Sequence, residues 1–269
     1  MGARNRRQRG GIVGQDPVGP LQGGQRVPLA AKPRLDAFAD PLLQQVSAAG
    51  VSSSLRFERA HEYLRLGRFG EAAAELKKVV AARRDDPYAH RDLGIASRQL
   101  GDLDEAARQL SAALAIKDDL SEARLELGLT LLDLERGDEA VGHLRRAMLE
   151  LPRDPRPAAH LGVALARQGL PDEALRQFEH AAGLGPLPAV ASFEWGGLLA
   201  RSRSYEAAAE RFRAALEQLP ENPEVLTNLG LTMEALGRVA EAVSYYRRAN
   251  AVEPNPLAAG RLRALGAGS

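Results

Sequence analysis

The hexapeptide Gly-Arg-Phe-Gly-Glu-Ala at 67–72 returns 34 residues later as Gly-Asp-Leu-Asp-Glu-Ala at 101–106. Related stretches keep this spacing: Arg-Gly-Asp-Glu-Ala at 136–140, Gly-Leu-Pro-Asp-Glu-Ala at 169–174, a degenerate Ser-Tyr-Glu-Ala-Ala-Ala at 204–209, and Gly-Arg-Val-Ala-Glu-Ala at 237–242. A fixed period of this length is typical of repeat proteins. The sequence therefore divides into six units of 34 residues, which start at Ser53, Pro87, Ser121, Pro155, Ala189 and Pro223.

Three positions of the unit keep one kind of side chain throughout. Position 20 is always alanine, position 8 is alanine or glycine, and position 24 is large and apolar. On a helix, positions 4, 7, 8 and 11 share one face, and positions 17, 20, 24 and 27 share one face of a second helix. Small residues at positions 8 and 20 let the two backbones approach closely. Each unit is therefore predicted to be a helix hairpin, with helix A over positions 1–14 and helix B over 17–30.

Helix starts support this prediction. Three units begin with a capping side chain directly before a proline: Asp86-Pro87, Asp154-Pro155 and Asn222-Pro223. One hairpin cannot bury its own apolar face, so the units should stack as one solenoid. Trp195, at position 7, is expected in the core. Residues 256–265 can form a further helix, in which Leu257, Leu262 and Leu265 cover the last unit.

The pattern resembles the tetratricopeptide repeat family, which the small residue at position 8, the alanine at 20 and the proline at 32 of the last four units indicate. The resemblance covers about three quarters of the chain. It implies an all-α fold, a right-handed superhelical α-solenoid of six helix-turn-helix hairpins plus a C-terminal capping helix. We expect a disordered basic arm over 1–33, a short helix and linker over 34–52, the repeat array over 53–256, and a capping helix and tail over 257–269.

Composition excludes several classes of protein. Thirty-six basic and 35 acidic side chains give a net charge of +1, although the first 35 residues hold seven basic side chains and one acid. There is no cysteine, which excludes disulfides, thiolate metal sites and a cysteine nucleophile. No apolar run approaches the roughly 18 residues that cross a bilayer, and the basic start lacks the apolar stretch of a secretory signal. We expect a cytoplasmic protein without a membrane span.

Catalytic motifs are absent from the sequence. No two of the five histidines stand four residues apart, so no helical metal site is predicted. The glycines at position 8 lie inside predicted helices and not in a strand-to-helix turn, so they do not form a phosphate-binding loop. Acidic pairs such as Asp172-Glu173 fall in the first turn of B helices, where the helix dipole favours them. We predict no enzymatic activity, no cofactor and no metal.

The other face of the A helices, at positions 2, 5, 9, 12 and 13, is the candidate binding site. In tetratricopeptide repeat proteins this face lines a concave groove that binds partner segments, and the resemblance implies the same here. In units three to five its residues are largely apolar, with arginines along its edge. The candidate groove residues are Phe57, His61, Arg91, Arg98, Leu125, Leu129, Leu132, Val163, Arg167, Phe193, Gly197, Arg201 and Leu231. Gly197, one turn beyond Phe193, should leave a pocket.

Two interpretations of the leucines at positions 5, 9 and 12 stay open at this stage. They form an apolar binding site, or the next A helix in a tight stack buries them. Co-chaperones of this family that bind acidic C-termini carry lysine and asparagine at positions 5, 6 and 9. In this sequence none of these positions is lysine, and Asn228 is the one asparagine among them. An apolar or amphipathic segment of a partner protein fits this surface better than a terminal carboxylate.

The sequence thus predicts a non-catalytic scaffold whose groove binds a partner protein of unknown identity. The alternative is self-assembly, in which residues 34–50 of one copy dock into the groove of the next. Its basis is the apolar stripe formed by Leu42, Leu43 and Val46. Clustered arginines at 4, 6, 7 and 9 can contact the phosphates of nucleic acid, but such a tail is more often a solvated leader, so we do not expect nucleic acid as the partner.

Overall fold

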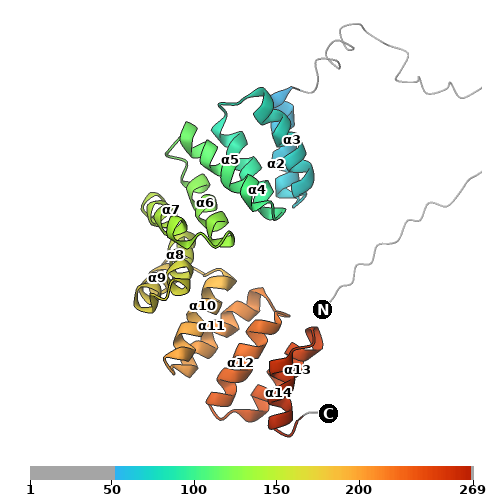
Figure 1. Cartoon of the computed structure of the whole chain (residues 1–269), viewed down its shortest axis with the longest axis vertical. Coiled ribbons are helices and arrows are strands. Elements are labelled where there is room, and N and C mark those ends of the chain that lie inside the picture. Colours follow the sequence, from blue (N-terminus) through green and yellow to red (C-terminus); the bar gives the residue numbers. More distant parts are fainter. Residues whose placement is uncertain (1–51, 268–269) are drawn as a thin grey trace, which may run out of the picture. The chain divides into compact units, whose positions relative to one another are not determined.

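The structure is a computed structural model that describes residues 52–267. The predicted basic arm and the segment 34–50 lie outside the described residues. The described residues all belong to one compact unit, Val51–Ser269. The described part is all-helical and consists of thirteen helices in tandem, as predicted (Figure 1). The helices are α2 (Ser53–Arg65), α3 (Phe69–Ala82), α4 (Pro87–Gln99), α5 (Leu103–Ile116), α6 (Ser121–Asp133), α7 (Gly137–Glu150), α8 (Pro155–Arg167), α9 (Pro171–Leu184), α10 (Ala189–Arg201), α11 (Tyr205–Gln218), α12 (Pro223–Ala235), α13 (Val239–Val252) and α14 (Pro256–Ala264).

Every A helix covers positions 1–13 of its unit and every B helix covers positions 17–30. The A helices therefore end one residue earlier than predicted. The reason is the turn, because the residue at position 15 takes a positive φ in every unit. In unit one, for example, the backbone N–H of Gly67 donates to Leu64 and that of Arg68 donates to Tyr63 across this turn. Such a left-handed residue closes a helix by satisfying its last carbonyl groups.

Positions 8 and 24 hold each hairpin together. Five A helices carry glycine at position 8, and a side chain there would collide with the residue at position 24 of the B helix. A Cβ added at Gly162 would lie 2.6 Å from Cε1 of Phe178, and one at Gly230 would lie 2.4 Å from Cε1 of Tyr246. The glycines thus permit the close approach that the sequence predicted, and the rings at position 24 are fully buried.

Each B helix also packs against the A helix of the next unit, so the hairpins form one continuous stack. Trp195 lies in the core, as expected, with its ring stacked on Phe178 at a centroid distance of 5.8 Å and an interplanar angle of 15°. The guanidinium of Arg211 lies 4.3 Å from the centre of the Trp195 ring. The predicted caps are present, because side-chain oxygens of Asp86, Asp154 and Asn222 accept backbone N–H groups of the following helix.

The helix α14 closes the stack on α13. Ala258 and Leu262 provide the buried contacts and Leu265 packs at their edge, whereas Leu257, predicted to cover the last unit, is 52% exposed. Asn255 caps this helix and Pro256 is its first residue. Arg263 is the eighth residue of α14, where the six A helices carry alanine or glycine, so a further B helix could not approach closely.

Candidate partner-binding site

We call the side of the six A helices that carries positions 2, 5, 6, 9, 12 and 13 the A-helix face. Four of the thirteen candidate groove residues on it are buried: Leu125, Leu129, Leu132 and Val163. The expectation that these side chains form an open apolar surface is wrong. Consecutive A helices contact one another, α4 with α6 and α6 with α8, so that the central leucines are covered from both sides and join the main hydrophobic core.

The other nine candidate residues reach the surface. Phe57, Arg91, Arg98, Phe193, Gly197 and Leu231 are partly exposed, and His61, Arg167 and Arg201 are exposed. These residues fall into two groups, one in units one and two and the other from Arg167 at the end of α8 to α12, and the buried candidates of α6 and Val163 lie between them in the sequence. In the first group the Phe57 ring lies 4.3 Å from the His61 ring, measured between centroids.

The A-helix face also carries a series of charged pairs at position 6. Among the described residues, a charged or ionisable side chain of one A helix pairs with position 6 of the next at four junctions, counting the sixth residue of α14. The pairs are His61–Asp92 at 2.6 Å, Arg98–Glu126 at 3.4 Å, Arg167–Glu194 at 3.3 Å and Glu234–Arg261 at 2.9 Å. Sequence reasoning placed the arginines on the edge of the groove but missed these partners, although the acids recurring at position 6 were a visible signal.

Burial shifts the pKa of two side chains at position 6. It raises the pKa of Glu126, an effect that the charge of Arg98 opposes. In the next unit, burial together with the positive charges of Arg98, Arg156 and Arg167 lowers the pKa of His160 to about 4, and Asp154 opposes this shift. His160 is therefore neutral near pH 7, and the junction between α6 and α8 has no carboxylate at position 6.

A first pocket, of about 290 Å³, lies beside Phe193. Val190 and Leu219 contribute to its apolar wall, and Arg167 and Glu194 stand at its polar side. The Phe193 ring rests on Phe212, with ring centroids 5.7 Å apart. Gly197 does not line this pocket, and a guanidinium nitrogen of Arg201 lies 3.7 Å from the point where its Cβ would be. The pocket beside the Phe193 ring is therefore not the one expected at Gly197.

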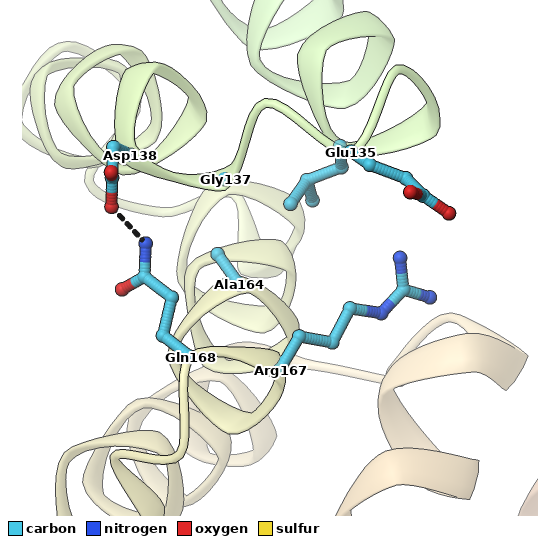
Figure 2. A pocket seen from close by; sticks show the side chains of 7 residues that line it. Glu135, Gly137, Asp138, Ala164, Arg167 and Gln168 are labelled. Carbon is cyan, nitrogen blue, oxygen red and sulfur yellow. Dashed lines mark hydrogen bonds between the residues drawn. The ribbon is translucent and has the colours of Figure 1, made fainter.

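A second pocket, of about 630 Å³, lies where α6 turns into α7 and meets the end of α8 (Figure 2). Leu132 and Ala164 are among its lining residues, although both side chains are buried. At one side the Gln168 side chain donates to Asp138 over 2.9 Å, and at the other the side chains of Glu135 and Arg167 point toward one another (Figure 2).

Arg167 lines both pockets, so they adjoin. Sequence reasoning missed the second pocket. The signals were departures from the repeat pattern, namely Glu135 in place of glycine at position 15 and Gly137 in place of a larger residue at position 17.

The linings of the two pockets include no histidine, serine, threonine, lysine or tyrosine. Throughout the stretch that the structure covers, no three histidine or acidic side chains gather in a way that could hold a metal ion. Between Ser52 and Ala267, no helix is long and apolar enough to cross a membrane. The predicted cytoplasmic location stays a prediction.

Solved structures of low sequence identity share this fold. A chain of the APC/C hetero-tetramer Cut9-Hcn1 matches with a TM-score of 0.70 and 18% identity over 80% of this chain, which spans only 43% of that one. PilF of Pseudomonas aeruginosa matches with a TM-score of 0.68 and 20% identity, over 79% of this chain and 96% of PilF. YrrB, a repeat protein with an unusual peptide-binding site, matches with a TM-score of 0.52 and 21% identity, over 70% of this chain and 97% of YrrB. These likenesses concern the fold alone.

No curated protein matches the chain in sequence. A family model does match it, three times in succession, over residues 57–122, 125–189 and 193–256, and its description is tetratricopeptide repeat. Each match spans two of the 34-residue units, so together they account for all six hairpins. Because these matches cover most of its length, the chain belongs to the tetratricopeptide repeat family.

Proposed function

We propose that the A-helix face of units four to six binds a segment of a partner protein. Tetratricopeptide repeat proteins are typically protein-interaction scaffolds, and they are generally non-catalytic. The peptide-binding site of YrrB, which has the same fold, supports this kind of role. The proposal narrows the groove expected from the sequence, because the apolar side chains of α6 and part of α8 are closed off.

The observation that carries the proposal is the pocket beside Phe193. Phe193 and Val190 are partly exposed there, whereas their counterparts in unit three are buried or charged. An apolar side chain of a partner can enter between α10 and α12 and contact the Phe193 ring. The charged pair of Arg167 and Glu194 at the edge can form hydrogen bonds with the partner's backbone or polar side chains. An amphipathic segment therefore fits this surface better than a wholly apolar one.

The expected affinity is modest. Burial of two apolar ligand side chains contributes roughly 3–6 kcal/mol, at about 1.5–3 kcal/mol each. Association and ordering cost about 4 kcal/mol or more. The net free energy from these two side chains is therefore small, and polar contacts along the same face must supply most of the remaining binding free energy. A short peptide should bind with a micromolar or weaker Kd.

A displayed peptide library selected against the full chain tests the proposal. Selected peptides are labelled, and their affinity for wild type and variants is measured by fluorescence anisotropy. Phe193→Ala should weaken binding about tenfold or more, since it removes roughly 1.5–3 kcal/mol of apolar contact. The matched control is Leu149→Ala, which removes an apolar side chain that is 77% exposed on α7, away from the A-helix face.

Circular dichroism and thermal melts must accompany these measurements, because Phe193 also packs on Phe212. If Phe193→Ala remains folded and binds selected peptides as tightly as wild type, while Leu149→Ala weakens them, the site is not on the A-helix face.

A further inference from the structure

Gly137 has no structural reason to be glycine. It is the first residue of α7, and its φ lies outside the left-handed region. A Cβ added there would meet only the side chain of Gln168, its Nε2 at 3.4 Å and its Cγ at 3.9 Å. The other five units carry a larger residue at this position: Phe69, Leu103, Pro171, Tyr205 and Val239. The missing side chain leaves open space in the pocket of about 630 Å³ in Figure 2, a size within the usual range of ligand sites.

The charges around this space are unbalanced. Glu135 and Asp138 both line the pocket, and within residues 52–267 neither forms an ion pair. Asp138 accepts a hydrogen bond from Gln168, which is neutral. The cation in the lining, Arg167, is already paired with Glu194 through its Nε. The lining of the pocket therefore has an excess of negative charge.

We propose that this pocket binds a lysine or arginine side chain of the partner segment. Such a side chain combines an aliphatic stem with a charged end. The stem would lie in the space left by Gly137. The charged end would then reach the carboxylate of Glu135, and Asp138 at the other side of the pocket adds to its negative charge (Figure 2). This inference rests on the proposed function for the identity of the partner, but the pocket itself can be tested separately.

The position of Arg167 relates this pocket to the one beside Phe193. Because Arg167 lines both, one segment crossing it can place an apolar residue against Phe193 and a basic residue beside Gly137. The partner class is thus a segment that carries an apolar and a basic side chain a short distance apart, and a purely acidic segment is disfavoured.

The probe for a direct test is N-acetyl-arginine amide, titrated into the ¹⁵N-labelled full chain and followed by NMR at the amides of Gly137 and Asp138 and at the side-chain amide of Gln168. N-acetyl-citrulline amide has the same shape without the charge. We expect saturable shifts in the millimolar range for the arginine compound and at least threefold weaker binding of the citrulline compound.

Two variants and their controls decide the outcome. Gly137→Leu installs the residue that unit two carries, and it should abolish the shifts without lowering the melting temperature. Gly142→Leu, on the exposed side of the same helix, should leave them unchanged. Glu135→Gln should weaken binding about three- to fivefold, and Glu179→Gln on α9 should not.

Equal binding of the two compounds, or shifts that persist in Gly137→Leu, would overturn the inference. If the shifts appear only after residues 1–33 are deleted, the chain's own basic arm occupies the pocket and the assignment to a partner is wrong. None of these results depends on whether a peptide binds beside Phe193, so failure of this inference is distinguishable from failure of the proposed function.

Discussion

Arg203 stands at position 15 of unit five with a φ of 63°, whereas four other units have glycine there with φ between 69° and 79°. We predict that Arg203→Gly stabilises the protein. A non-glycine residue in this conformation destabilises the folded state by roughly 1–2 kcal/mol. Replacing it with glycine removes this strain, but the greater freedom of glycine in the unfolded chain offsets about 0.5–1 kcal/mol of the gain. The Arg203 side chain is exposed and makes no hydrogen bond or ion pair within the described part. The net gain should therefore be about 0.5–1 kcal/mol.

Urea denaturation followed by circular dichroism at 25 °C measures this gain. The reverse change, Gly169→Arg, should lose a similar amount, because Gly169 has a φ of 75° at the same position of unit four. Repeat arrays can unfold in steps, so the comparison holds only where the transition is two-state. If Arg203→Gly lowers the free energy of unfolding, or Gly169→Arg leaves it unchanged, the left-handed turn is not the feature that sets these energies.

Four further predictions follow from the packing and the charges. Leu129→Arg should cost several kcal/mol or prevent folding in a urea titration, because it places a charge in the core; a folded variant of wild-type stability would contradict the burial of this face. Gly162→Val should cost about 1–3 kcal/mol by collision with Phe178, and a gain would show that the hairpin can open at no cost. His160 has a pKa of about 4 in the folded chain against 6.5 in the unfolded chain, so it does not change the free energy of unfolding above pH 6.5 and lowers it as the pH falls, by roughly 3 kcal/mol at pH 4. His160→Gln should flatten this dependence of the free energy of unfolding on pH, and an unchanged dependence would contradict the assignment. If residues 34–50 dock into a neighbouring copy, light scattering should show oligomers that deletion of residues 1–50 dissolves; a monomeric full-length chain would exclude this alternative.

Helix boundaries were predictable because they depend on a local pattern that recurs. The residues at positions 8, 20 and 24 place both helices of every hairpin, and the caps at Asp86, Asp154 and Asn222 mark three of the starts. The end of the A helices was predicted one residue too late. It is set by the left-handed turn, which Glu135 and Arg203 adopt without glycine.

The binding surface was predictable only in part. Helical periodicity identifies the face on which Leu125 and Val163 lie, but their burial depends on how closely α4, α6 and α8 pack, and that distance is not a property of one helix. The second pocket was readable in principle, because Gly137 breaks the pattern at position 17. Its significance emerges only from the structure, in which Gln168 alone approaches the position that a Cβ of residue 137 would take.

Hydrogen–deuterium exchange of the full chain, with and without a peptide selected from the displayed library, tests the central claim most directly. The account predicts slower exchange in α8, α10 and α12, including the segment around Phe193, with little change in the B helices α9, α11 and α13. Protection confined to the B helices, or spread over α2 and α4 alone, would contradict the assignment of the partner site to the A-helix face of units four to six.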